Sequence, residues 1–591
     1  MQQRESLEMA NKTNKDIISA FYFFDGKLAL AFKDNKYGFI DTLGQAKIAY
    51  KYDEARPFDN YGLARVRRSN HFYLLDTTKT EYLLADGAGN LTKGIRVLDD
   101  SNKQYDIFPE KVLEYQSLNI LLMSGNYFSK LPESINKMRN LKILVLNKNE
   151  LINLPDSINK LDTLTLLDVS ENRLSMLPSA LCELTSLRDL YVNDNYIDKL
   201  PANFYKLFYL THLDLGNNQI RNLPDALESL AYLRTLKING TQLKEFPKVI
   251  FNYWELEELN LSENQITELP GDIGVLNRLV WLNMSGNSIE TMPDEIEQLK
   301  NLQVLSMSNN QIGFIPPQIG NCKQLNIFDM GGNKIAELPE SIRKLKHISI
   351  LDLGANEIVN FPNQIFCLKG LKILKLGNNK IANIPGDSLY QLANLSSLDL
   401  SHNQIKVVPP EIDTLKSLSE IFLQGNKIVK LPDEFSQLQF LDELDLSNNK
   451  LKDLPKEFDR LQNLNRLNLS NNQFADYPVQ ISKLYSLYNL NISNNQLKTL
   501  DDKIDWLVNL SQLDLSENKL TTLPANFGGL NQLEWLDLSE NHLSALPESF
   551  GKLQKLTFLD LSNNNLVSLP ASISGLLALS TLTWTSQNQT R

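Results

Sequence analysis

Cysteine and histidine are scarce in this sequence of 591 residues, which contains three cysteines and five histidines. The cysteines, Cys182, Cys322 and Cys367, lie far apart, which excludes a dense disulfide framework and a cysteine-rich metal site and suits a reducing compartment. No His-Glu-x-x-His motif is present. We therefore expect no metal, no cofactor and no catalytic cysteine, and small buried packing roles for the three thiols.

Long apolar runs are also missing from the sequence. No segment reaches the roughly 18 consecutive apolar residues of a membrane-spanning helix. Residues 1–20 carry several charges and no continuous apolar stretch, so no secretory signal can be read there. We expect a cytoplasmic protein without a membrane span, although the sequence leaves export by a non-standard route open.

Positive charge is not in excess, because 59 basic side chains oppose 70 acidic ones for a net charge of −11. This balance argues against nucleic acid or an anionic membrane surface as the main partner. Hydrophobic residues at 42% and charged residues at 22% exclude wholesale disorder. The chain can therefore bury a large core.

A repeated unit organises most of the chain. From Leu118 onward the pattern Leu-x-x-Leu-x-Leu-x-x-Asn-x-Leu recurs at intervals of 23 residues, with a single interval of 24. A proline follows each asparagine position by six residues, except where Asp501 replaces it. Thr241 occupies one asparagine position, and the other nineteen are Asn126, Asn149, Asn172, Asn195, Asn218, Asn264, Asn287, Asn310, Asn333, Asn356, Asn379, Asn403, Asn426, Asn449, Asn472, Asn495, Asn518, Asn541 and Asn564.

Each column of the repeat has a physical role. The Leu-x-Leu alternation predicts a short strand whose leucines point into the core, and such strands would stack in parallel. The asparagine amide can satisfy backbone groups of adjacent coils, which predicts an asparagine ladder. The Leu-Pro step is expected to open a helical return segment, with proline in its first turn. Because Thr241 has one hydroxyl where its neighbours have an amide, we expect a weak point in the ladder there.

These residues resemble the leucine-rich repeat family, and the 23-residue Leu-Pro-x-x-Ile-x-x-Leu form resembles its intracellular Ras-suppressor and plant Ras-group class. The resemblance implies an α/β solenoid, or horseshoe, with a concave parallel β-sheet and short helical or 3-10 convex segments. A small β-rich module is expected before it. We assign residues 95–117 to a degenerate capping repeat, 118–578 to twenty repeats, and 579–591 to a partial C-terminal capping repeat.

The N-terminal part has a different pattern, with aromatic residues, short alternating runs and self-similarity at 35 residues. Phe23 aligns with Phe58, and Tyr37 aligns with Phe72, which predicts two β-hairpin-like units. The stretch from Lys36 to Asp41 resembles the bacterial WG repeat, which implies a bacterial protein. We assign residues 1–19 to a flexible N-terminus, 20–85 to the WG-like β module, and 86–94 to a linker.

Outward-facing strand positions are the main candidates for function. Four residues before the asparagine position, the column is acidic, and its carboxylates could serve acid–base chemistry or simply keep a solvated face soluble. The aspartates of this column are Asp168, Asp214, Asp329, Asp352, Asp399, Asp445, Asp514, Asp537 and Asp560.

Apolar residues interrupt the outward columns in three places. The patch near the N-terminal end has two interpretations, docking of the WG-like module or partner recognition; it comprises Ile120, Leu122, Ile143, Val145 and Leu166. The second stretch runs from Trp281 to Ile373 on successive repeats and has a polar border, which is typical of a recognition surface. The β-propensity of apolar residues at exposed strand positions would also explain it. The predicted partner-binding residues, which include a third group near the C-terminus, are Trp281, Val304, Ile327, Ile350, Ile373, Asp329, Asp352, Lys375, Phe422, Trp535 and Phe558.

We interpret the sequence as a non-enzymatic scaffold or adaptor, in cytoplasmic signalling, that binds a protein partner on its concave face. One alternative is a substrate-recognition or regulatory subunit of a signalling enzyme encoded separately. Another is an exported or surface-associated binding protein. The sequence names neither the partner nor the oligomeric state, because recognition depends on side-chain combinations on a fold that hosts many functions.

Overall fold

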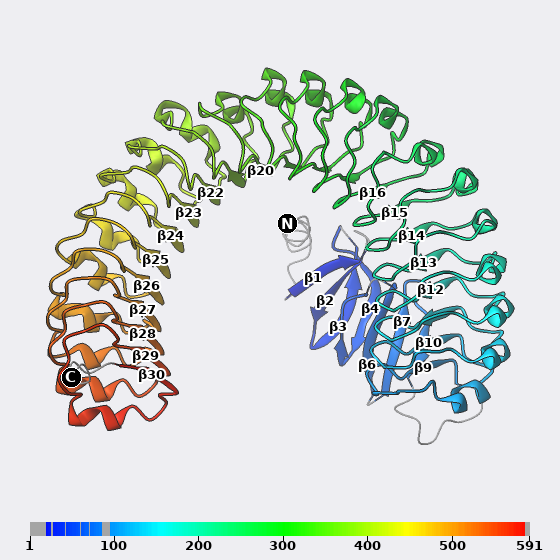
Figure 1. Ribbon diagram of the computed structural model, residues 1–591, viewed down its shortest axis with the longest axis horizontal. Coiled ribbons are helices and arrows are strands. Elements are labelled where there is room, and N and C mark those ends of the chain that lie inside the picture. Colours follow the sequence, from blue (N-terminus) through cyan, green and yellow to red (C-terminus); the bar gives the residue numbers. More distant parts are fainter. Residues whose placement is uncertain are drawn as a thin grey trace, which may run out of the picture. The chain divides into compact units, whose positions relative to one another are not determined.

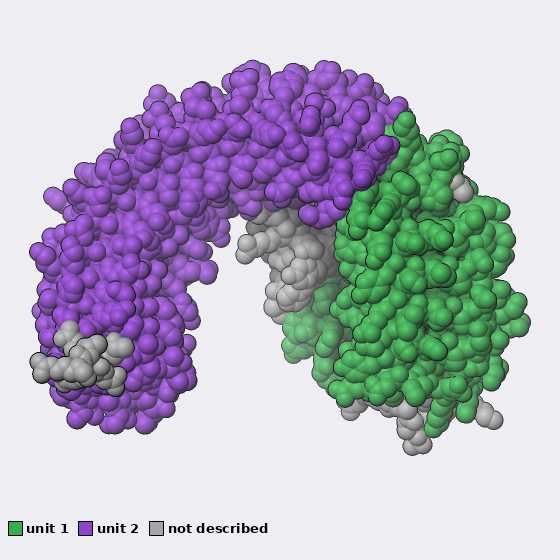
Figure 2. Space-filling view, viewed as in Figure 1, with its two compact units in different colours: residues 1–243, 247–256 green, residues 244–246, 257–591 purple. Residues whose placement is uncertain are grey.

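The computed structural model describes residues 19–24, 28–41, 43–59, 61–69, 71–84 and 95–584. The chain divides into two compact units (Figure 2): Met1–Leu243 with Pro247–Leu256, and Lys244–Phe246 with Glu257–Arg591. The predicted flexible N-terminus, apart from Ser19, and the predicted linker lie outside the described residues. So do residues 585–591 of the predicted C-terminal capping repeat.

Unit 1 begins with two four-stranded antiparallel sheets, which we call the N-terminal module (Figure 1). Their strands are β1 (Ser19–Phe24), β2 (Leu28–Lys33), β3 (Lys36–Ile40), β4 (Ala46–Tyr52), β5 (Glu54–Ala55), β6 (Leu63–Arg68), β7 (His71–Asp76) and β8 (Glu81–Leu83). The 35-residue self-similarity corresponds to the hairpins β2–β3 and β6–β7. Each hairpin gains one further strand on either side, which the sequence pattern did not predict.

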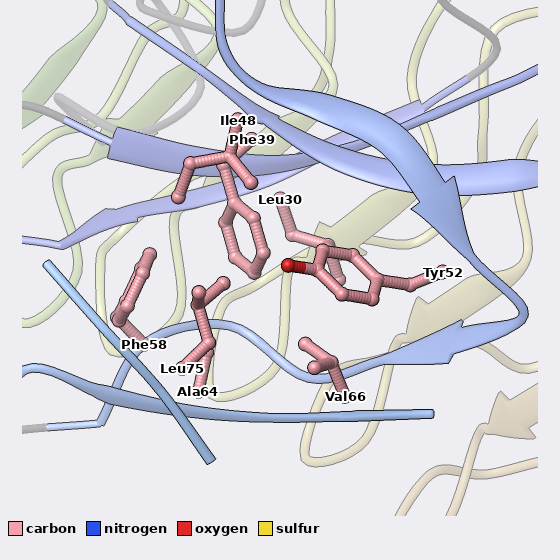
Figure 3. Packing of buried hydrophobic residues seen from close by; sticks show 8 residues of the cluster. All are labelled: Leu30, Phe39, Ile48, Tyr52, Phe58, Ala64, Val66 and Leu75. Atoms are coloured by element: carbon pink, nitrogen blue, oxygen red, sulfur yellow. The ribbon is translucent and has the colours of Figure 1, made fainter. Parts of the chain in front are cut away.

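The two sheets of the N-terminal module share an apolar core of three aromatic and five aliphatic side chains (Figure 3). The rings of Phe39 and Phe58 lie 4.7 Å apart between centroids. The fully buried Tyr52 donates its hydroxyl hydrogen to Oε1 of Glu81 over 2.8 Å, which satisfies the polar end of the ring. Lys51 and Arg68 also form ion pairs with Glu81, so this carboxylate ties β4 to the second sheet.

The rest of unit 1 consists of parallel strands that alternate with 3-10 helices. Each strand pairs with the next in a register of 23 residues, as between Leu121 and Leu144. The strands are β9 (Val97–Asp99), β10 (Ile120–Leu122), β11 (Ile143–Val145), β12 (Leu166–Asp168), β13 (Asp189–Tyr191), β14 (His212–Asp214) and β15 (Thr235–Lys237). The 3-10 helices are η1 (Glu110–Glu114), η2 (Glu133–Lys137), η3 (Asp156–Lys160), η4 (Ser179–Glu183), η5 (Phe204–Lys206), η6 (Asp225–Ser229) and η7 (Lys248–Asn252).

Unit 2 continues the same alternation, with its strands on the inner side of the unit and its 3-10 helices on the outer side (Figure 1). The strands are β16 (Glu258–Asn260), β17 (Trp281–Asn283), β18 (Val304–Ser306), β19 (Ile327–Asp329), β20 (Ile350–Asp352), β21 (Ile373–Lys375), β22 (Ser397–Asp399), β23 (Glu420–Phe422), β24 (Glu443–Asp445), β25 (Arg466–Asn468), β26 (Asn489–Asn491), β27 (Gln512–Asp514), β28 (Trp535–Asp537), β29 (Phe558–Asp560) and β30 (Thr581–Thr583). The helices are η8 (Gly271–Val275), η9 (Asp294–Gln298), η10 (Pro317–Asn321), η11 (Glu340–Lys344), η12 (Asn363–Cys367), η13 (Gly386–Leu392), η14 (Pro410–Thr414), η15 (Asp433–Gln437), η16 (Phe458–Arg460), η17 (Val479–Lys483), η18 (Asp502–Trp506), η19 (Phe527–Gly529), η20 (Glu548–Lys552) and η21 (Ala571–Gly575).

Asparagine side chains connect successive coils. The Nδ2 atom of Asn310 donates to Met307 O in its own coil and to Met284 O in the preceding coil, each over 3.0 Å. Its Oδ1 atom accepts a hydrogen bond from Ile289 N, also at 3.0 Å. One amide thereby satisfies three backbone groups that the short strands leave without partners.

The residue before each asparagine position has a positive φ in all twenty coils, as at Asn309 with 54° and Gly332 with 66°. This left-handed residue lies three residues after the end of the strand, as Asn309 does after β18, and glycine and asparagine adopt its conformation at low cost. Glycine and asparagine accordingly fill twelve of these twenty positions, as at Gly125 and Asn563.

The return segments differ from the prediction in one respect. Pro132 is extended, with ψ of 151°, and its carbonyl oxygen accepts the first bond of η2 from Ile135 N. Proline therefore lies before the 3-10 helix and does not belong to a helical first turn. Where Asp501 replaces proline, its carboxylate caps η18 by accepting a hydrogen bond from Lys503 N.

Candidate functional site

Each short strand presents two outward side chains and one inward side chain. In β17 the middle residue, Leu282, is fully buried, whereas Trp281 and Asn283 are half-buried. This alternation follows from the two-residue period of the strand. The outward residues of adjacent strands therefore form continuous rows in unit 2.

Five apolar side chains follow one another in such a row on β17 to β21, and we call them the central strip. They are Trp281, Val304, Ile327, Ile350 and Ile373. All five are half-buried, so each still offers apolar surface to solvent. A contiguous apolar row on a solvent-facing sheet is typical of a binding surface.

Polar residues border the central strip on the same strands. Ser306 donates its hydroxyl hydrogen to Oδ2 of Asp329 over 2.8 Å. Lys375 Nζ lies 3.0 Å from Oδ2 of Asp352, and this hydrogen bond raises the pKa of Lys375. The border thus includes the cation of Lys375, paired with Asp352, beside the apolar row.

The aspartate column has a structural role that the sequence interpretation missed. Oδ1 of Asp352 accepts a hydrogen bond from Gly354 N at 3.0 Å, and Oδ1 of Asp537 accepts one from Ser539 N at 2.8 Å. The same bond to the backbone two residues onward occurs at all nine aspartates. These carboxylates fix the turn at the end of each strand, as Asx turns do. The recurring serine or glycine two residues later was the available signal.

The remaining predicted partner-binding residues occupy later strands of unit 2. Trp535 and Phe558 stack with ring centroids 5.2 Å apart and planes inclined by 7°. Phe422 lies on β23, in register with Asp399 and Asp445 on the neighbouring strands. Phe422 is therefore separate from both the central strip and the stacked pair.

The N-terminal module covers the apolar patch on β10 and β11. Leu63, Leu74 and Leu84 of the module form one buried cluster with Val97 and Ile120 of the repeats. Leu122 and Ile143 pack against the same cluster. Of the two interpretations of this patch, the structure therefore supports docking of the N-terminal module.

Cys182 and Cys322 are buried, as expected, whereas Cys367 is only half-buried and its sulfur accepts a hydrogen bond from Arg343 Nη1. Burial raises the pKa of Cys182 to about 12 and that of Cys322 to about 11, so neither thiol is ionised at neutral pH. Among the described residues, no cluster of three or more histidine, cysteine or acidic side chains could hold a metal ion. Within the same residues, no helix combines the length and apolarity that crossing a membrane requires.

Sequence families match both parts of the chain. The leucine rich repeat family matches residues 139–197, 185–243, 254–312, 346–405, 369–428, 416–474 and 485–543, together more than half of the chain. A two-copy leucine rich repeat family matches residues 300–347 and 531–577. The WG containing repeat family matches residues 37–70, within the N-terminal module.

Solved structures resemble the chain over most of its length. A leucine-rich repeat protein of Leptospira interrogans is 37% identical, with a TM-score of 0.58 over 62% of this chain and 95% of that one. The Arabidopsis receptor kinase HAESA, in complex with the peptide hormone IDA and the co-receptor SERK1, is 26% identical, with a TM-score of 0.62 over 84% and 88% of the chains. The GASSHO1/SCHENGEN3 ectodomain from Arabidopsis thaliana, in complex with CASPARIAN STRIP INTEGRITY FACTOR 2, is 28% identical, with a TM-score of 0.56 over 83% and 64%. No curated protein matches the sequence.

Parallel strands, short 3-10 turns and small antiparallel sheets confirm the predicted fold class, a leucine-rich repeat solenoid with a β-rich N-terminal module. The chain belongs to the leucine-rich repeat family, and it carries a WG containing repeat near its N-terminus.

Proposed function

We propose that this protein is a non-enzymatic adaptor that binds a protein partner on the central strip. The observation that carries the proposal is the register of the five apolar side chains on β17 to β21, bordered by Asp329, Asp352 and Lys375. Binding of apolar anchors there would remove half-exposed apolar surface from water. We infer that the stacked pair Trp535 and Phe558, together with Phe422, extends the contact for a larger partner.

The geometry of the strip favours an extended segment of the partner. Five strands spaced about 4.8 Å apart give a row of about 19 Å, which about six extended residues span. Because side chains alternate along such a segment, about three of them would face the strip. Two related solenoids, HAESA and GASSHO1/SCHENGEN3, are described in complex with a peptide hormone and with CASPARIAN STRIP INTEGRITY FACTOR 2, which supports a peptide-like occupant here.

We further infer a bacterial, cytoplasmic signalling scaffold of the 23-residue intracellular class. The regular Leu-Pro step and the three free cysteines support this assignment. The identity of 37% with a Leptospira protein and the WG containing repeat support a bacterial origin. Fractionation of native cells tests the location, because recovery outside the cytoplasm would contradict it.

A capture experiment tests the binding surface. The double variant Trp281→Asp with Ile350→Asp introduces charge into the strip, so the tagged protein should retain less than a tenth of the partner captured by the wild type. The control is Val359→Asp with Trp506→Asp, since these side chains of unit 2 are 53% and 40% exposed outside the strip. Equal capture by the two double variants, both folded by circular dichroism, would contradict the proposal.

A further inference from the structure

A polar groove with a volume of about 450 Å³ lies in unit 2, where strands β25 to β28 begin. Asn465, Tyr488, Ser511 and Glu534 each immediately precede one of these strands and line the groove. The side chains form a row because the repeat brings equivalent positions side by side. The groove is separate from the central strip, which lies on β17 to β21.

A second row lines the groove three residues before the strands. It contains Ser486, Asn509 and Gln532. Asn509 donates its amide hydrogen to Tyr485 O over 2.8 Å, which holds the side chain in place and leaves its Oδ1 atom as an acceptor. Asn465 is held in the same way, because its Nδ2 atom donates to Oδ1 of Asp442.

Ser511 differs from the other hydroxyl residues that immediately precede a strand. Its side chain is 3% exposed, and its Oγ atom makes no hydrogen bond with the described residues. In the repeats, every other serine or threonine that immediately precedes a strand donates to an oxygen atom of the preceding coil: Thr165, Thr211, Ser349, Ser396, Ser419, Thr557 and Ser580. A buried hydroxyl without a partner costs free energy, which a ligand oxygen at the groove would recover.

The chemistry of the lining points to one class of ligand. Tyr488 is 48% exposed and offers a flat apolar ring beside hydroxyl, amide and carboxylate groups. Sugar rings present C–H faces that stack on such a ring and hydroxyls that pair with amides and carboxylates. None of the seven described lining residues is basic, and Glu534 is acidic, which disfavours phosphate, sulfate or carboxylate groups in the ligand. Lys555 contacts this lining only through Oε1 of Gln532, to which it donates a hydrogen bond. A peptide anchor would need more than one apolar side chain in the groove.

We propose that this groove binds an uncharged oligosaccharide. Tyr488 stacks on a sugar ring, Asn465, Asn509 and Glu534 accept hydrogen bonds from its hydroxyls, and rotation of Ser511 about χ1 turns its hydroxyl toward the ligand. Four strands span about 14 Å, which exceeds the size of a single sugar ring. The groove would therefore give the protein a second binding activity, independent of the central strip.

Isothermal titration calorimetry of the full chain with cellohexaose, chitohexaose and maltohexaose tests this proposal. At least one of the three should bind, and Tyr488→Ala should weaken its binding at least tenfold. Tyr485→Ala is the matched control because Tyr485 is 45% exposed and does not line the groove. That variant should bind within twofold of the wild type.

Three outcomes would overturn the proposal. The first is no binding of any of the three hexaoses at millimolar concentration by the folded wild type. The second is equal binding by the wild type and Tyr488→Ala. The third is tighter binding of a sulfated heparin hexasaccharide than of all three neutral sugars, because the lining residues include one carboxylate and no basic side chain.

Discussion

The hydroxyl of Tyr61 donates a hydrogen bond of 2.5 Å to Oδ2 of Asp168, which joins the N-terminal module to strand β12. The ring of Tyr61 also meets Tyr191 edge-on, with centroids 6.3 Å apart. Asp168 is 3% exposed, and its other carboxylate oxygen accepts hydrogen bonds from Ser170 N and Oγ. A buried carboxylate thus holds the module against the repeats in unit 1.

Removal of the Tyr61 hydroxyl should loosen the module. In Tyr61→Phe the buried carboxylate loses one donor, which should lower the free energy of unfolding of unit 1 by about 1–3 kcal/mol. Hydrogen exchange in β6 to β8 measures the effect locally. Tyr196→Phe is the control because Tyr196 is exposed, and equal exchange in both variants would count against this anchoring role.

The same carboxylate predicts a dependence of stability on pH. Burial raises the pKa of Asp168 above its ordinary value of 3.8, although hydrogen bonds from Ser170 and Tyr61 oppose this shift. The folded state therefore binds the proton more tightly than the unfolded state does, so the stability contribution falls as the pH rises through the folded pKa. Asp168→Asn removes the ionisable group but keeps an acceptor oxygen for Ser170 N, as Asn283 does for Ser285 N, and its amide nitrogen can donate to the Tyr61 hydroxyl oxygen. This variant should melt at a higher temperature than the wild type at pH 7. The melting temperatures of the wild type and Asp168→Asn should converge as the pH falls toward 3.8. A difference in melting temperature that does not change with pH would contradict this prediction.

Thr241 should mark a weak coil in the asparagine ladder. Its hydroxyl donates to Ile238 O over 3.0 Å, but a hydroxyl supplies one donor where an amide supplies two. Thr241→Asn should therefore stabilise this coil by about 1 kcal/mol and slow its hydrogen exchange. The reciprocal Asn310→Thr should speed exchange in its own coil. Uniform wild-type protection across the fifth to seventh coils would show that the threonine makes no difference.

Ser511 should tolerate loss of its hydroxyl better than its equivalents do. Ser511→Ala removes a buried group without a partner and should leave the unfolding free energy unchanged or raise it by up to about 1 kcal/mol. Ser419→Ala breaks the hydrogen bond to Ser396 O and should lower the free energy of unfolding by about 1 kcal/mol. Chemical denaturation measures both variants, and an equal loss in both would mean that the Ser511 hydroxyl is satisfied after all.

The sequence predicted those features that depend on periodicity. Leucines at alternate positions placed the strands, and the asparagine column marked the turn that follows each strand. The coils had to stack because a single coil cannot bury its own leucines. The prediction that proline lies in the first helical turn was wrong, because proline is the extended residue just before each 3-10 helix, as at Pro132. The fixed φ of proline suits both positions.

Other features depend on contacts between distant residues. Nothing in the local pattern around Tyr61 indicated Asp168 as its partner, because they are 107 residues apart. The groove at β25 to β28 was missed for a different reason: serine, asparagine and glutamine at exposed positions are common, and their arrangement becomes informative only when the coils stack. The central strip was visible in sequence because the 23-residue interval alone aligns Trp281 with Val304.

Photo-crosslinking at the central strip tests the main proposal most directly. Benzoyl-phenylalanine at Val304, in the middle of the strip, should give a covalent adduct with a cellular protein after irradiation in native cells. The same residue at Val359, which is exposed outside the strip, should give none. Adducts at Val359 but not at Val304, from folded protein, would contradict binding on the strip.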